Sequence, residues 1–164
     1  LLTVGIPILA IAAWARPGSP PRSVIRSTSH FVFPAAFTVS VVSLAIYLAY
    51  LGTTGDVDVA RTALTTASVL CGLALIPFVE PPAEAWVGGD ALSGDWRPTL
   101  LALGMLGLFG LIMAVPPLRA FFELTPLRGW DYAIIAVAVM VWALLLRFAW
   151  RARLFQRLLD LEIR

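Results

Sequence analysis

Long apolar stretches separated by short polar segments dominate the chain. The first complete stretch, Phe31–Leu51, contains no Asp, Glu, Lys or Arg. As a helix it would be about 30 Å long, the thickness of the hydrocarbon core of a bilayer. A helix that is apolar on every side has no face suited to water. The pattern therefore predicts a transmembrane helix at this position.

Three further stretches repeat the pattern, at Ala60–Val79, at the shorter Thr99–Val115 and at Trp130–Trp150. Leu1–Ala13 is also apolar, but as a helix it would be only about 20 Å long, which is short for a span. We expect it to be the end of a truncated helix. The predicted fold class is all-α: a polytopic transmembrane helical bundle with four full spans and one partial N-terminal helix.

Polar and basic segments divide the chain into four expected parts. Residues 1–15 would end the truncated transmembrane helix, and residues 16–30 would form a cytoplasmic linker rich in Arg and Pro. Residues 31–150 would form the four-helix transmembrane bundle. Residues 151–164 would continue as a basic amphipathic C-terminal tail, with leucines on one helical face and arginines on the opposite one. A helix of that kind lies on a membrane surface.

The composition agrees with a membrane protein. The chain is 60% hydrophobic and 13% charged, with a mean hydropathy of +0.88, whereas soluble domains carry about 25% charged residues. The expected partner is the lipid bilayer, and the net charge of +2 is too small to indicate nucleic acid. The single cysteine, Cys71, excludes an internal disulfide and a cysteine-based metal site.

The arginines predict the orientation of the chain in the membrane. All 12 basic residues are arginine, and placing the linker and the C-terminus inside puts nine of them inside and three outside. The positive-inside rule favours that arrangement, with a cytoplasmic C-terminus. Arg147, near the end of the last span, can extend its side chain to the headgroups. The predicted membrane-interface residues are Trp14, Arg16, Arg22, Arg26, Trp130, Trp150 and Arg151.

Glycines recur in the third span. Gly104, Gly107 and Gly110 are spaced by three residues, which leaves a smooth strip where a neighbouring helix can approach closely. We expect this strip to be a helix-packing face. The alternative is that the strip faces lipid.

Residues that could perform chemistry are scarce. The sequence contains no Ser/His/Asp set, no Gly-rich phosphate loop and no His/Cys cluster, and no carboxylate lies in the middle of a span. The carboxylates of the loop Pro81–Pro98 could belong to a metal site or to a solvated loop. Their spacing fits no calcium-loop pattern, so we expect a solvated loop. We predict no catalytic and no metal-binding residue in this chain.

The order of short motifs resembles a known family. The motifs are LTVGIP at residues 2–7, ARPG at 15–18, HFVFPAA at 30–36 and ARTA at 60–63. Together they resemble the C-terminal membrane region, helices six to ten, of bacterial cation-transporting P-type ATPases. The likeness is greatest to the actinobacterial subgroup called cation-transporting ATPase E.

This resemblance implies a function that the residues alone do not. The chain would be the C-terminal membrane domain of an ATP-driven cation pump in the plasma membrane, supporting the ion-translocating helices. The transported cation would be calcium first, with magnesium or manganese behind it. The full-length pump would use ATP and Mg²⁺ bound by upstream domains of the same polypeptide, and no catalytic residue carries over to this chain.

Two other functions remain open at this point. The chain could be a stand-alone, non-catalytic membrane bundle that binds a partner subunit. It could also be a piece of an unrelated secondary transporter. A phosphorylation motif of the Asp-Lys-Thr-Gly type in the upstream coding sequence would distinguish the pump from both.

Overall fold

The computed structural model describes Gly5, Leu9, residues 24–79 and residues 94–151. Its helices are α2 (Val24–Thr54), α3 (Val57–Val79), α4 (Arg97–Ala114), α5 (Pro116–Phe121) and α6 (Gly129–Arg151). All regular elements in this part of the chain are helices, which confirms the predicted all-α class. Four of them, α2, α3, α4 and α6, are long and apolar enough to cross a membrane. The predicted count of four full spans is therefore confirmed.

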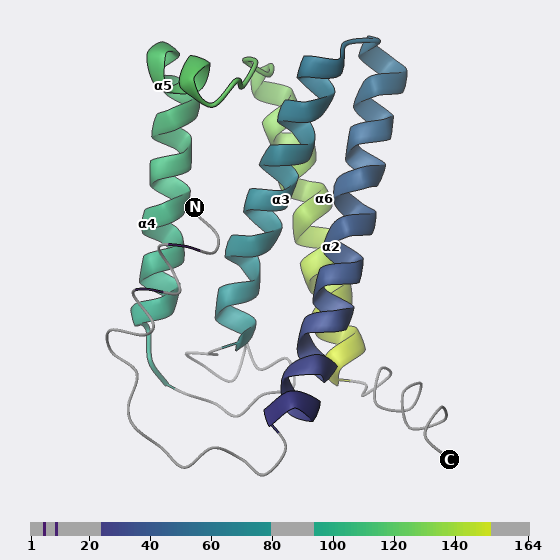
Figure 1. Ribbon diagram of the computed structural model, residues 1–164, viewed down its shortest axis with the longest axis vertical. Helices are drawn as coiled ribbons and strands as arrows, with labels where there is room; N and C mark the ends of the chain where they lie inside the picture. Colours follow the sequence, from purple (N-terminus) through teal and green to yellow (C-terminus); the bar gives the residue numbers. More distant parts are fainter. Residues whose placement is uncertain (1–4, 6–8, 10–23, 80–93, 152–164) are drawn as a thin grey trace.

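The helix α3 is the centre of the bundle. It packs against α2, α4 and α6, whereas α2 and α6 touch each other less extensively. In its most apolar stretch 44% of the residues are buried, against 17%, 28% and 22% in the other three spans. Figure 1 shows α3 between α4 and α2, with the short α5 at the same end as the α2–α3 turn. We call this the α5 end, and the opposite one the Trp96 end.

The turn between α2 and α3 is set by two residues. Gly55 has a φ of 68°, a left-handed conformation that glycine adopts without steric cost, and its N–H bonds the Leu51 carbonyl at 2.9 Å. Asp56 then caps α3, because its Oδ1 accepts the backbone N–H of Asp58 at 2.8 Å and that of Val59 at 3.3 Å. Such a cap satisfies N–H groups that have no partner within the helix.

Prolines start the two helices that follow. Pro98 lies in the first turn of α4, and Pro116 opens α5 directly after Val115, which is extended at φ −92° and ψ 111°. Proline suits a first helical turn because its missing N–H would have no partner there. Pro116 thus begins a short helix directly after the third span.

The first span differs from the prediction in where its helix begins. The apolar pattern placed the linker at residues 16–30 and the span from Phe31, but α2 already starts at Val24 and continues through Pro34. The apolar stretch marks only the part of the chain that lies in the hydrocarbon core of the bilayer. The helix itself can extend past this stretch into the membrane interface. Residues 10–23, and with them most of the predicted linker, lie outside the described residues.

Candidate functional site

A hydrogen bond joins α2 to α6 at the α5 end. The Tyr50 hydroxyl donates to Oδ1 of Asp131 at 3.2 Å. The other oxygen of Asp131 accepts the backbone N–H of Arg128 at 2.9 Å, so this carboxylate also closes the start of α6, as the acidic partner in a capping box does. One acidic side chain therefore fixes both a helix start and a contact between helices.

The connection between α5 and α6 is held onto α3 at the same end. Thr125 donates its backbone N–H to the Thr62 hydroxyl at 2.9 Å, and Thr62 donates in turn to the Asp58 carbonyl at 2.9 Å. An exposed ion pair joins Arg61 to Glu123 at 3.6 Å, although pairs so exposed contribute little stability. Glu123 has a φ of 53°, which is uncommon for a residue with a side chain and reverses the chain after α5.

Several hydroxyl groups within the spans have protein partners. Ser68 of α3 donates to Ser43 of α2 at 3.0 Å, which links the two helices inside the bundle. Thr38, Ser40 and Thr66 bond carbonyls of their own helices at 2.7, 2.8 and 2.8 Å. Within the described residues, no group of three or more His, Cys, Asp or Glu side chains could hold a metal ion. The geometry thus serves helix packing.

The tightest packing lies where α3 meets α6 and α2. Ala63, Ala67 and Cys71 of α3 have no exposed surface, and Ile135 of α6 is 1% exposed. Small residues on α3 allow the backbones to come close, which is the usual basis of helix association in lipid. The only cysteine of the sequence therefore has a packing role.

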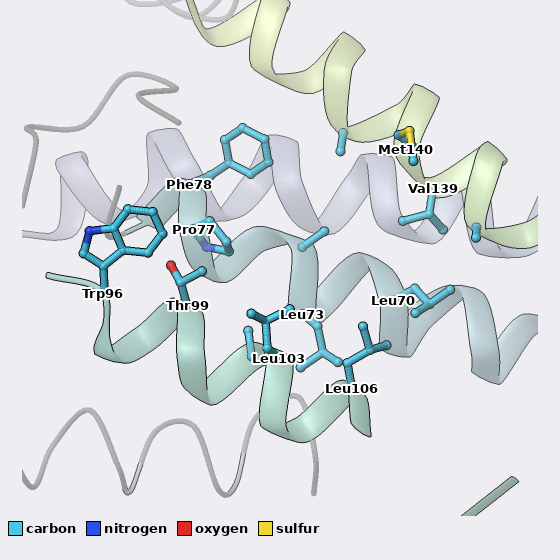
Figure 2. A pocket seen from close by; sticks show the side chains of 14 residues that line it. Leu70, Leu73, Pro77, Phe78, Trp96, Thr99, Leu103, Leu106, Val139 and Met140 are labelled. Atoms are coloured by element: carbon cyan, nitrogen blue, oxygen red, sulfur yellow. The ribbon is translucent and has the colours of Figure 1, made fainter. Parts of the chain in front are cut away.

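Between α3, α4 and α6 the structure leaves an apolar groove, which we call the α4 groove. It has a volume of about 510 Å³. Its lining includes Leu70, Leu73, Pro77 and Phe78 from α3, Trp96, Thr99, Leu103 and Leu106 from the α4 segment, and Val139, Met140 and Ala143 from α6. Figure 2 shows Trp96 and Thr99 beside Pro77 and Phe78 at one end of the groove, and Leu106 near Leu70 at the other.

Three buried polar atoms have no hydrogen-bond partner in the described part of the chain. They are Oγ1 of Thr99, Nε1 of Trp142 and Nε of Arg147. Thr99 lines the α4 groove at the Trp96 end. Arg147 follows Ala143 by four residues on α6, so it lies on the same helical face, one turn nearer the Trp96 end. Unpartnered buried polar groups are costly. Thr99 belongs to the lining of the groove, and Arg147 lies just beyond that lining along α6.

The predicted glycine face is open. Gly104, Gly107 and Gly110 lie exposed on α4, and a Cβ added at any of them would meet nothing within 4 Å. The contact of α4 with α3 is made instead through Ala102 and Met105 of α4. A partner for the glycines would have to come from outside the described residues, so their role in packing stays a prediction.

The predicted interface residues are described only in part. Trp130 stands at the start of α6 and is 75% exposed. Arg26 lies in the first turn of α2, and Trp150 and Arg151 lie in the last turn of α6. Trp14, Arg16 and Arg22 lie outside the described residues, as do the tail 152–164 and residues 80–93 of the predicted loop.

The sequence reading missed the α4 groove and the Tyr50–Asp131 contact. One pattern in the sequence could have indicated the groove. One face of α6 carries residues at spacings of three and four, namely Ala136, Met140, Ala143 and Arg147. The Tyr50–Asp131 contact spans 81 positions of the chain, and no local pattern in the sequence points to it.

Comparison with known proteins gives one informative match. The family model described as "Cation transporting ATPase, C-terminus" matches residues 19–152, a range that contains all four candidate spans. No curated protein and no solved structure gave a significant match. Because the family model covers most of the sequence, and does so over the four-span bundle, the chain belongs to the family of C-terminal membrane regions of cation-transporting ATPases.

Proposed function

We propose that this chain forms the last four membrane helices of an ATP-driven pump for a divalent cation, with calcium as the first candidate. The family match over residues 19–152 is the observation that carries this proposal. The short motifs in the first third of the sequence favour a bacterial pump of the actinobacterial ATPase E subgroup. The membrane would then be the plasma membrane.

In this proposal the module supports the ion-translocating helices and does not itself bind the transported ion. The hydroxyls of Ser43 and Ser68 bond each other, and Thr38, Ser40 and Thr66 donate to carbonyls of their own helices, so these groups are oriented by contacts within the bundle. Cation paths through membranes usually carry acidic side chains. The carboxylates of the described residues lie at or next to helix starts, as Asp58 and Asp131 do, or in the connection after α5, as Glu123 does. ATP and Mg²⁺ would bind to upstream domains of the same polypeptide.

The arginine distribution supports a cytoplasmic Trp96 end. Arg61, Arg119 and Arg128 belong to the α5 end, while Arg97 and Arg151 belong to the first and last turns of α4 and α6 at the opposite end (Figure 1). A reporter cysteine in place of Ile163 should not react with an impermeant maleimide added to intact cells, whereas one in place of Glu123 should react. The reverse result would invert the topology.

The transport function can be tested on the full-length protein in proteoliposomes. We expect ATP-dependent uptake of radioactive calcium, together with an acid-stable phosphorylated intermediate that forms only when the transported cation is present. Uptake of manganese or magnesium without calcium would overturn the choice of ion. The absence of ATP-driven uptake for all three would overturn the pump and favour a bundle that binds a partner subunit.

The supporting role has its own test. The chain purified alone in detergent should release no phosphate from ATP above a blank preparation, because no phosphate-binding motif is present in its sequence. ATP hydrolysis by the chain alone would contradict the proposal that the catalytic groups lie upstream.

A further inference from the structure

The α4 groove combines an apolar interior with polar groups at one end only. Along its length the lining is Leu, Ala, Val and Met. At the Trp96 end it has the indole of Trp96, which is 54% exposed, and the unpartnered Thr99 hydroxyl. Figure 2 shows both residues at the same end of the groove. An occupant that matches this surface must be apolar over most of its length and polar at one end.

Arg147 adds a positive charge at that end. Its Nε is buried without a hydrogen-bond partner, and neither ion pair found in the described residues includes it. A charged side chain at membrane depth needs a partner of opposite charge or a path to water. The positive charge of Arg147 therefore favours an anionic group at the Trp96 end, next to the apolar interior of the groove.

The side chains that line the groove argue against a tightly packed helix as occupant. Helices associate in lipid through small residues that let their backbones approach. The α4 groove instead presents the long side chains of Leu70, Leu103, Leu106 and Met140, which conform readily to a flexible chain. The glycines of α4 lie exposed in open space and do not line the groove.

We propose that the α4 groove binds one anionic phospholipid of the leaflet at the Trp96 end. An acyl chain lies between Leu103 of α4 and Met140 of α6, and the phosphate is held by the Arg147 guanidinium. The Trp96 indole lies at the level of the headgroup, the usual position for tryptophan in membrane proteins. The lipid acts as a wedge that keeps α4 at its distance from α6. This site is independent of which cation the protein transports.

Native mass spectrometry of the full-length protein in mild detergent tests the proposal. Phosphatidylglycerol and phosphatidylcholine of equal chain length are titrated separately, without ATP or transported cation. The parent protein should bind one phosphatidylglycerol more tightly than phosphatidylcholine. Arg147→Gln should weaken phosphatidylglycerol binding by about fivefold, which corresponds to the attraction of one arginine for an anionic headgroup. Equal binding by the parent and Arg147→Gln would overturn the proposal.

Two matched controls separate the groove from general surface effects. Arg97→Gln removes an arginine from the same end of the bundle, but Arg97 is exposed at the start of α4, whereas Arg147 is half-buried on α6, so binding should not change. Ala136→Phe fills the groove from α6, whereas Ala45→Phe adds the same bulk to an exposed position on α2. Only Ala136→Phe should reduce binding. Equal losses for the members of either pair would mean that the lipid does not occupy the groove.

A photoreactive phosphatidylglycerol gives a measurement that does not depend on any variant. With a diazirine in one acyl chain, it should label peptides covering residues 96–106 and 136–143. Labelling confined to the exposed faces of α2 would overturn the site. The absence of labelling at the groove, together with binding unaffected by Arg147→Gln, would mean that another part of the polypeptide covers the groove and neutralises Arg147.

Discussion

On one side of α3, helices α2 and α6 pack closely enough to leave Ala63, Ala67 and Cys71 with no exposed surface. On its other side, α4 meets α3 less extensively than α2 does, borders a groove and exposes its glycines. The side-chain hydrogen bonds between helices also lie on the closely packed side. The Ser43–Ser68 and Tyr50–Asp131 bonds both lie among α2, α3 and α6.

This difference indicates that the two sides of the bundle have different structural roles. The α2–α3–α6 side has a closely packed core and hydrogen bonds between its helices, so it can act as a fixed support. The α4 side leaves an apolar groove and an exposed strip of glycines, so it offers surface to molecules other than the described residues. In the pump proposed above, the closed side would support the ion-translocating helices, and the open side would contact the surroundings of the module.

The largest expected effect comes from removing a core side chain on the closed side. Ile135→Ala should lower the free energy of unfolding by about 2–5 kcal/mol, because the residue is 1% exposed and truncation leaves a cavity. The measurement is the unfolding midpoint in mixed detergent micelles. Ile134→Ala is the control, since Ile134 is 46% exposed and should lose little. Equal losses at the two positions would contradict the assignment of the closed side.

The next comparison introduces leucine on the closed side of the bundle, at Ala67 of α3, and on the open side, at Gly107 of α4. Ala67→Leu adds bulk to a position with no exposed surface and should cost about 1–3 kcal/mol through overpacking. Gly107→Leu in the chain alone should cost nothing, because open space lies beside Gly107 and leucine favours the helix more than glycine does.

The effect of Gly107→Leu on the full-length protein distinguishes a glycine strip that packs against another helix from one that faces lipid. If an upstream helix packs there, Gly107→Leu should lower the unfolding midpoint of the full-length protein while leaving that of the chain alone unchanged. An unchanged midpoint in both would show that the glycines face lipid. A loss in the chain alone would contradict the open face.

The spans could be predicted from the sequence because a bilayer imposes one length on every apolar helix. The expected Trp130–Trp150 corresponds to α6 at Gly129–Arg151, and Ala60–Val79 to α3 at Val57–Val79. The start of α2 at Val24 was missed, because Arg26 and His30 do not suit hydrocarbon although a helix at the interface accommodates them.

The α4 groove could not be predicted in the same way. Its existence depends on how far α4 lies from α6, and that distance follows from which residues of α3 each helix contacts. A hydropathy pattern reports depth in the membrane and not the angle between two helices. The unpartnered state of Arg147 is likewise a property of the assembled bundle, although its place near the end of a span was apparent in the sequence.

A smaller effect is expected at the contact between α2 and α6. Tyr50→Phe removes the donor to Asp131 and should cost about 0.5–1.5 kcal/mol, the net value of one hydrogen bond. A double-mutant cycle with Asp131→Ala isolates the pair, because Asp131 also caps α6 through Arg128 and the cost of losing that cap cancels in the cycle. Additive losses in the cycle would mean that the two side chains do not interact, and that the cap alone explains the role of Asp131.

The smallest effect is expected inside the membrane, at the bond from Ser68 to Ser43. Hydrogen bonds between membrane helices average only about 0.6 kcal/mol in double-mutant cycles, because the separated helices find other partners for the same groups. Ser43 is 5% exposed and lies between α2 and α3, so the cycle of Ser43→Ala and Ser68→Ala should show a coupling of about this size. Ser40→Ala is the control, since Ser40 is exposed and bonds the Ala36 carbonyl of its own helix. If the Ser43–Ser68 coupling is zero, close packing of α3's small residues alone holds the closed side together, and its difference from the α4 side is one of shape and not of polarity.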